Sequence, residues 1–322
     1  MEEPTVVGID IAKRKFDVVL LSEGKEKSGT FQNTPGGFSM LARWLERYGA
    51  SQVHACMEAT GVYGDELARY LHGAGHVVSV VNPAKVKGFA QSELSRTKTD
   101  KADARLIARF CRTMRPEPWQ PPAQHEKQLQ ALVHRAQSLK DMVSQERNRR
   151  ETTEGPARAS IERTIRHLEE ELRITRELIR DHIDQHPDLR GKRELLESIP
   201  GIGPATSAMI LAEFGDVMRF QDARRMAAFC GLTPRQRQSG SSVRGKTRLS
   251  KTGSARIRRA LFMPALVAMR RNPAIAAFCE RLRSYGKCPM VIVGAVMRKL
   301  IHIAFGVLKS GKPFDPAIAM TA

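Results

Sequence analysis

Four carboxylates in the first third of the chain have the residue types and spacing that a metal-dependent phosphoryl-transfer site needs. Asp10 ends a β-branched run, Glu58 ends another, and Asp100 and Asp103 lie three residues apart where a helical pattern begins. Residues at i and i+3 share one face of a helix. Carboxylate oxygens suit Mg²⁺ or Mn²⁺ rather than Zn²⁺. Two such ions about 3.5 to 4 Å apart can activate a nucleophile and stabilise a leaving oxygen.

Each acid also has a simpler interpretation when it is taken alone. Asp100 could cap the helix that follows it, and Glu58 could be an exposed loop acid. Four clustered carboxylates would repel one another, so the cluster predicts a bound cation if the fold brings the acids together. We therefore expect Asp10, Glu58, Asp100 and Asp103 to be catalytic metal ligands.

A second group of residues suits a different task, contact with a phosphate backbone. The segment 233–254 is rich in Ser and Gly and reads as a polar loop. Cations interleaved with small polar residues can follow a nucleic-acid strand, whereas the scarcity of aromatic residues argues against stacking on unpaired bases. A solvated loop without a ligand is the alternative. The candidate nucleic-acid-binding residues are Arg235, Arg237, Arg244, Lys246, Arg248 and Lys251.

The charge of the chain agrees with this interpretation. The 322 residues carry a formal net charge of +19, and residues 191–322 hold 23 basic and only 7 acidic side chains. Such an excess attracts a polyanion, DNA or RNA, and places most of the attraction in the C-terminal part. The five cysteines form no CxxC pair, which argues against a disulfide framework or a zinc knuckle and fits a reducing cytosol.

Short strands and helices must position the four acids. Three strands are expected at 5–9, 16–21 and 29–32, followed by a helix at 38–48, a strand at 52–57, a helix from Asp65, a strand at 76–81 and a helix near Lys101. This βββαβαβα order is that of the ribonuclease H fold. In such a sheet the first and fourth strands are neighbours, which would bring Asp10 and Glu58 together.

Prolines at 116, 121 and 122 end this region, and apolar residues then recur at heptad spacing in two sets, 129–143 and 161–179. An intramolecular hairpin of two helices and a dimerising coiled coil both satisfy the pattern. Beyond Pro187 we expect only helices apart from the basic loop. Residues 200–205 resemble a helix-hairpin-helix turn, although a tight turn that needs glycine for packing is equally acceptable. The apolar stretch 290–308 contains Arg298 and Lys299, so we expect a packing helix and no membrane span.

Three segments around the acids resemble a known family. Gly8–Lys13 (GIDIAK), Glu58–Tyr63 (EATGVY) and Lys98–Ala104 (KTDKADA) are similar to the signature segments of the insertion-sequence DEDD transposases, bridge-RNA-guided recombinases with a RuvC-like domain. The resemblance extends through Ile199–Gly203 (IPGIG) and Phe229–Pro234 (FCGLTP) to Ser239 and the glycine after it. It covers essentially the whole chain, and none of the four acidic positions departs from the pattern.

The patterns and the resemblance together predict a RuvC-like ribonuclease H domain at 1–117, a coiled-coil helical connector at 118–190 and a helical transposase domain at 191–322. The resemblance further implies a serine that attacks DNA and becomes joined to it through a phosphate, and Ser239 matches that position. Residue chemistry alone does not separate Ser239 from Ser241 and Ser242. The implied partners are donor and target double-stranded DNA, a guide (bridge) RNA and further copies of the chain, as a dimer or tetramer. The implied location is the bacterial cytoplasm, on the nucleoid.

We therefore expect an insertion-sequence recombinase that uses Mg²⁺ and Ser239. The alternatives are a RuvC-like structure-selective nuclease whose nucleophile is water, a nucleic-acid scaffold without metal, and an actin-like ATPase. The last is disfavoured because the chain has no later glycine-rich phosphate loops.

Overall fold

The structure is a computed structural model of the whole chain, and it describes residues 4–59, 61–93, 99–239 and 243–317. The chain forms two compact units, Met1–Pro121 and Pro122–Ala322, each with its own hydrophobic core. The helical segment expected at 118–190 falls largely within the second unit. Its standing as a separate domain stays a prediction.

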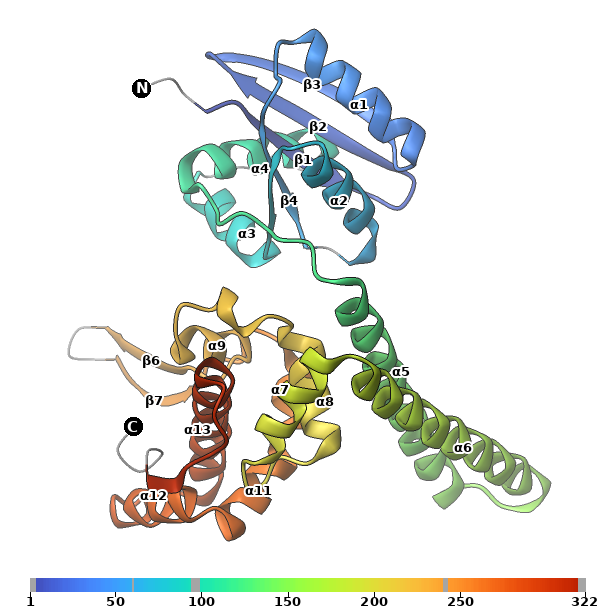
Figure 1. Cartoon of the computed structure of the whole chain (residues 1–322), viewed down its shortest axis with the longest axis vertical. Helices are drawn as coiled ribbons and strands as arrows, with labels where there is room; N and C mark the ends of the chain where they lie inside the picture. Colours follow the sequence, from blue (N-terminus) through green and yellow to red (C-terminus); the bar gives the residue numbers. More distant parts are fainter. Residues whose placement is uncertain (1–3, 60, 94–98, 240–242, 318–322) are drawn as a thin grey trace. The chain divides into compact units, whose positions relative to one another are not determined.

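A five-stranded sheet with the order β3-β2-β1-β4-β5 forms the N-terminal unit (Figure 1). β1 pairs antiparallel with β2, which pairs antiparallel with β3, whereas β4 runs parallel to β1 and β5 parallel to β4. The strands are β1 (Val6–Ile11), β2 (Lys15–Ser22), β3 (Lys25–Gln32), β4 (His54–Glu58) and β5 (Val77–Val81). The helices are α1 (Pro35–Arg47), α2 (Asp65–Gly73), α3 (Pro83–Ser92) and α4 (Asp100–Met114).

Both faces of this sheet are covered, because successive side chains of a strand point to opposite faces. Val7 and Ile9 of β1 join a core with Leu41 of α1 and Leu67 of α2. Val6 and Cys56 join a second core with Ile107 and Ala108 of α4. The predicted order of strands, and the pairing of the first strand with the fourth, are confirmed. Helix α3 was not predicted.

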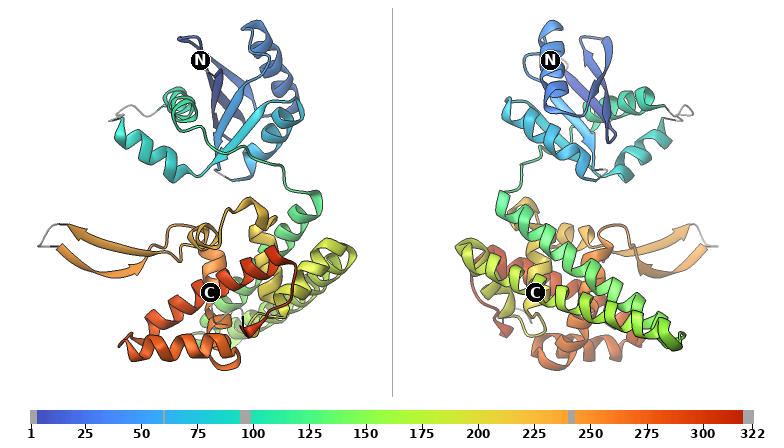
Figure 2. Two further views of the ribbon diagram at one scale, coloured as in Figure 1. Left: turned by 60° about the vertical axis from the view of Figure 1, so that its left-hand side comes forward. Right: turned by 90° about the vertical axis from the view of Figure 1, so that its right-hand side faces the viewer.

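Two long helices open the second unit, α5 (Gln124–Glu151) and α6 (Gly155–Gln185). They pack against one another, as Figure 2 shows, and bury Leu139 and Val143 on one helix and Ile165 and Leu172 on the other. The hairpin alternative of the heptad prediction is therefore present within the chain. Association of two chains through these helices stays a prediction.

The rest of the second unit is helical except for one pair of strands. The helices are α7 (Pro187–Glu197), α8 (Pro204–Phe214), α9 (Ala223–Phe229), α10 (Ala255–Ala260), α11 (Phe262–Arg271), α12 (Pro273–Ser284) and α13 (Pro289–Ser310). The strands are β6 (Pro234–Ser239) and β7 (Val243–Leu249), an antiparallel hairpin. The prediction of an irregular loop here, and of an all-helical C-terminal part, was therefore wrong. These strands carry cations where an apolar face would reveal a strand, so their pattern was missed.

Two further features answer questions that the sequence left open. Within the turn before α8, Gly201 has φ +107°, and a Cβ there would meet the backbone of Ala268 at 3.0 Å, so backbone conformation and packing both favour glycine, and phosphate contact by this turn stays a prediction. In the described part of the chain, one helix is long and apolar enough to cross a membrane, and that helix is α13. However, residues such as Val296, Leu300 and Ile301 are buried in the core of the unit, as expected of a packing helix.

Candidate functional site

Parallel pairing of β1 with β4 brings the first two acids to adjacent strands. Ile9 pairs with Met57, and Asp10 and Glu58 are the next residue of each strand. Glu58 ends its strand as predicted, whereas β1 continues one residue beyond Asp10. Both side chains are half-buried.

Helix α4 supplies the other two acids, and its backbone lies directly against β1. Thr99 caps the helix, since its Oγ1 accepts a hydrogen bond from the Ala102 amide at 3.2 Å. The alternative interpretation of Asp100 as that cap is therefore wrong. A Cβ at Gly8 would lie 2.2 Å from the carbonyl oxygen of Ala104 and 2.2 Å from the Ala108 amide nitrogen. Only glycine allows this approach, and it sets the distance between β1, which carries Asp10, and the first turns of α4, which carry Asp103.

The four acids are close enough to perturb one another. The pKa of Asp10 is raised from its ordinary 3.8 to about 6, chiefly by burial and then by the negative charges of Asp103, Asp100 and Glu58. Burial and then Asp103 likewise raise the pKa of Glu58. Carboxyl groups shifted in this way hold excess negative charge that a cation would relieve.

One lysine that sequence reasoning missed already meets part of this charge. Lys15 Nζ lies 2.9 Å from Asp100 Oδ2 and 3.3 Å from Asp17 Oδ2. Its hydrogen bond lowers the pKa of Asp100, opposite to the shift of Asp10. An alternation of charge along β2, with Lys15 and Asp17 on one face, is the signal that could have indicated it.

The donor set fits a hard divalent cation in its chemistry, since all four side chains offer carboxylate oxygens. Lys15 contacts Asp100 and Asp17, whereas the pKa of Asp10 is raised by burial and then by the charges of the other three acids. As the side chains stand, no three His, Cys, Asp or Glu side chains of the described residues are close enough together to hold one metal ion. Shared coordination by Asp10, Glu58, Asp100 and Asp103 therefore stays a prediction, and it requires their side chains to draw closer.

In the second unit, the predicted nucleophile lies on the β6–β7 hairpin, which stands out from the helices (Figure 2). Ser239 is the last residue of β6, and its backbone pairs with Val243. Ser241 and Ser242 lie outside the described residues. The predicted basic residues lie on β6, on β7 and just after them: Arg235, Arg237, Arg244, Lys246, Arg248 and Lys251.

Backbone contacts fix the root of this hairpin. The amides of Ser250 and Lys251 donate to the carbonyls of Thr233 and Gly231 at 2.9 and 3.1 Å. A Cβ at Gly253 would lie 2.3 Å from the carbonyl oxygen of Phe229, so only glycine fits at this position.

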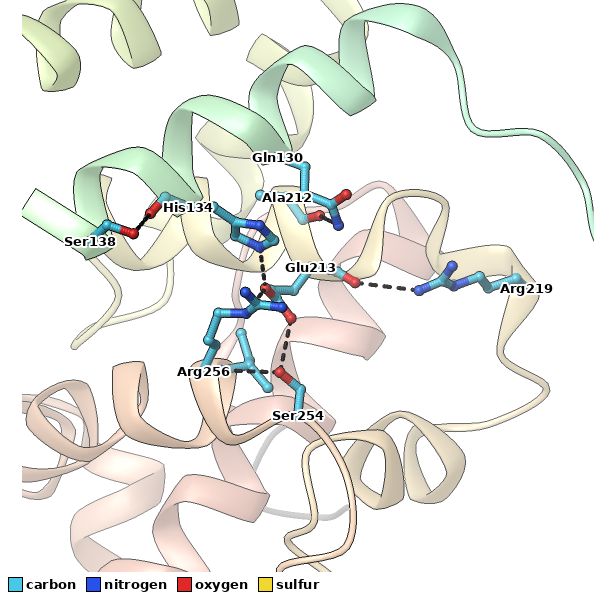
Figure 3. A network of polar contacts seen from close by, with 9 residues as sticks. Gln130, His134, Ser138, Ala212, Glu213, Arg219, Ser254 and Arg256 are labelled. Carbon is cyan, nitrogen blue, oxygen red and sulfur yellow. Dashed lines mark hydrogen bonds and ion pairs between the residues drawn. The ribbon is translucent and has the colours of Figure 1, made fainter. Parts of the chain in front are cut away.

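A buried carboxylate, Glu213 of α8, anchors the segment that leaves the hairpin (Figure 3). His134 Nε2 of α5 lies 2.8 Å from its Oε1, and Ser254 Oγ donates to its Oε2 at 2.9 Å. Arg256 Nε of α10 lies 3.3 Å from Oε1. Burial would raise the pKa of Glu213, but these partners together hold it below its ordinary value. One carboxylate thus links α5, α8 and the segment that follows the hairpin. In the sequence, the only sign of this role is the position of Glu213 in an otherwise apolar helix.

Comparison with known proteins identifies the kind of protein that carries these features. Residues 193–280 match the model described as the transposase IS116/IS110/IS902 family, and residues 7–153 match a transposase model of the IS110 DEDD type. The pilin gene-inverting proteins of Moraxella bovis and Moraxella lacunata are each 37% identical over 317 residues, covering 98% of this chain and 98% of theirs. The transposase of insertion sequence element IS1328 from Yersinia enterocolitica is 26% identical over 98% of this chain and 100% of its own.

Among solved structures, the chain is similar to T. thermophilus RuvC in complex with a Holliday junction substrate. The match has 16% sequence identity and covers 36% of this chain and 99% of the RuvC chain. Its TM-score is 0.27. The full-length relatives and the two family models suffice: the chain belongs to the IS110 family of DEDD transposases, enzymes of DNA transposition and recombination.

Proposed function

We propose that this transposase is a Mg²⁺-dependent recombinase that cuts and rejoins DNA strands through Ser239, with a RuvC-like N-terminal domain. The observation that supports the proposal is the placement of Asp10 and Glu58 on adjacent strands, with Asp103 near enough that its charge, after burial, helps to raise the pKa of Asp10 to about 6. Neighbouring acids that repel one another destabilise a fold, whereas phosphoryl transfer with metal ions needs such a group of carboxylates.

The residues divide the chemistry between them. The Ser239 hydroxyl attacks a phosphorus atom of the DNA, the bond from phosphorus to one deoxyribose oxygen breaks, and that oxygen leaves with a proton. The serine oxygen is then joined to the phosphate until a second strand's hydroxyl displaces it and the serine regains its proton. A divalent cation held by Asp10, Glu58, Asp100 and Asp103, Mg²⁺ or Mn²⁺, would favour the ionised hydroxyl and balance charge on the phosphate.

The serine needs such help because a free hydroxyl is a weak nucleophile. It lies far along the chain from the acids, so we propose a composite site in which the hairpin meets an acidic cluster of the same chain or of a second copy. The gene-inverting activity in the names of the two Moraxella relatives supports strand exchange rather than simple cutting. We further propose donor and target double-stranded DNA and a guide RNA as partners, on the family resemblance.

Trapping the covalent protein–DNA adduct tests the assignment. Ser239→Ala is expected to abolish the adduct and leave nucleic-acid binding nearly unchanged, because one neutral hydroxyl adds little beside the surrounding cations. Ser241→Ala and Ser242→Ala are matched controls that should retain it. If one of the controls loses the adduct instead, the residue assignment is wrong. If every variant cleaves and no adduct forms, the alternative function, a nuclease that activates water, is the better one.

The guide RNA needs a separate test. Sequencing of nucleic acid that copurifies with the full chain should return one discrete RNA species encoded beside the gene. Random cellular RNA in its place would contradict guidance by RNA, without bearing on the serine chemistry.

A further inference from the structure

The most apolar helix of the chain carries one polar stripe that the proposed chemistry does not use. Arg298, Lys299 and His302 of α13 lie within one turn of each other and are half-buried, while the residues around them belong to the core. Arg224, which is exposed on α9, and Arg281, exposed on α12, come from helices that pack on α13. Two neighbouring helices thus add positive charge to the stripe.

Positive charge outnumbers negative charge here, because Asp222 is the one acid that acts on His302 in the described part of the chain. Within the described part of the chain, neither Arg224 nor Arg298 nor Lys299 forms an ion pair with a carboxylate. Burial and then Arg298, Lys299 and Arg224 lower the pKa of His302, and Asp222, which also interacts with Arg224, opposes them. Burial and Arg281 lower the pKa of Lys299. The cluster, here called the α13 cation cluster (Arg224, Arg298, Lys299 and His302), repels itself in the absence of an anion.

Two buried polar atoms near the cluster also have no partner. Among the described residues, neither His302 Nε2 nor Thr233 Oγ1 forms a hydrogen bond. Arg298 Nη1 donates to the carbonyl of Leu232 at 3.4 Å, so the cluster adjoins the segment in which Thr233 leads into β6. A Cβ on Gly294 of α13 would lie 3.2 Å from Leu249 of β7, which confirms that α13 lies beside the root of the hairpin. Buried polar atoms that lack partners usually mark a missing ligand or water.

We propose that the α13 cation cluster binds one phosphate group of the nucleic-acid backbone at the root of the β6–β7 hairpin. Arginine and lysine supply charge-assisted donors, and a neutral imidazole and a hydroxyl can each donate one more hydrogen bond to phosphate oxygens. A cation is excluded by the charge of the cluster, and an apolar ligand would leave its donors unpaired. The proposal rests on the proposed handling of nucleic acid by the hairpin, because a strand that follows the hairpin's cations would pass this root.

Such a contact would give the transposase a fixed reference point on the strand. Phosphate contacts determine the register of a protein on nucleic acid without reading its sequence. A phosphate held at the root of a two-stranded hairpin would set which phosphodiester reaches the hairpin end where Ser239 lies.

The experiment uses the full chain and two probes, a labelled DNA duplex and inorganic phosphate. Duplex affinity is measured over a range of salt concentrations for Arg224→Gln, Lys299→Gln and a matched control, Arg166→Gln, which removes an exposed cation from α6. Removal of a cation that contacts phosphate should reduce the slope of log K against log salt by about 1 and weaken binding severalfold. The control should change neither.

Imidazole NMR signals of the same protein provide the second measurement. The His302 signal, assigned with His302→Gln, should shift on addition of duplex and, at higher concentration, of inorganic phosphate. The proposal would be overturned if the cluster variants kept the affinity and salt dependence of Arg166→Gln. It would also be overturned if the His302 signal did not shift on addition of duplex. A response to free phosphate but not to duplex would also overturn it, since it would assign the site to a soluble anion. These readouts involve binding alone, so failure of Ser239 chemistry leaves them unaffected.

Discussion

Replacement of Gly8 by alanine should separate the acidic residues without touching any of them. The new Cβ would lie 2.2 Å from both the Ala104 carbonyl oxygen and the Ala108 amide nitrogen, whereas ordinary contact begins at 3.4 Å. Strand β1 and helix α4 must therefore move apart by at least 0.8 Å, the difference between 3.0 and 2.2 Å, and by 1.2 Å to restore ordinary contact at 3.4 Å. Because backbone atoms stand on both sides, no side-chain rotation can relieve the clash.

The cost of this movement follows from its size. Overpacking of a well-packed core typically costs about 1 to 3 kcal/mol, and an unyielding backbone places Gly8→Ala near ~3 kcal/mol or above. Misplacement of catalytic groups by about 1 Å can lower a rate by about 10²-fold. Asp10 is two residues from Gly8, and Asp103 is next to Ala104, so the same shift should reduce strand cleavage about that much even where the variant is folded.

Chemical denaturation and single-turnover cleavage would measure the two effects. Gly88→Ala is a matched control, because Gly88 lies within α3 with nothing near a new Cβ. There alanine should be neutral or stabilise by up to ~1 kcal/mol, and cleavage should be unchanged. If Gly8→Ala and Gly88→Ala have the same free energy of unfolding and the same cleavage rate, the contact between β1 and α4 does not position the acids.

Three further predictions concern other parts of the chain. Asp10→Asn should abolish metal-dependent cleavage yet stabilise the metal-free protein. The folded-state pKa of Asp10, about 6, lies above its ordinary 3.8, so wild-type stability should fall as pH rises from about 4 to about 6, and thermal melts should show the advantage of the variant growing across that window. Glu213→Gln should cost about 1 to 3 kcal/mol near neutral pH, because ionised Glu213 stabilises the fold. This penalty should shrink as pH falls below the ordinary pKa of glutamate and through the lowered pKa of Glu213, and equal denaturation midpoints at pH 7 would contradict it. The helices at 125–183 should hold copies together, so light scattering at micromolar concentration should report a dimer or tetramer, and a monomer with and without nucleic acid would count against it.

Part of the N-terminal unit could be predicted because its signals are local. The β-branched runs that end at Asp10 and Glu58 indicate strands, and the element order determines which strands are neighbours. From this, the approach of the two acids follows without coordinates. The contact at Gly8 could not be found in this way, since a glycine carries no pattern that says what lies against it.

Elsewhere the decisive partners are far apart in the sequence. Glu213 finds His134 and Ser254 across 79 and 41 residues, so no window of sequence contains the network. The strands that carry Arg235 and Arg248 lack the alternation of apolar and polar residues that marks a half-buried strand. A pattern search therefore interprets them as a loop, although the hairpin forms from backbone pairing at its fixed root.

The charge on the β6–β7 hairpin has a thermodynamic consequence. Arg235 of β6 pairs with Arg248 of β7, so like charges face each other across the ladder, which is destabilising. A two-stranded ribbon is at best marginally stable by itself. Any polyanion that binds the ordered ribbon better than the disordered one adds RT ln(1 + [L]/Kd) to its stability. Bound nucleic acid would then supply part of the free energy that orders the strand of Ser239. Under the proposed function, the protein alone would be less ready to cleave DNA than the assembled complex.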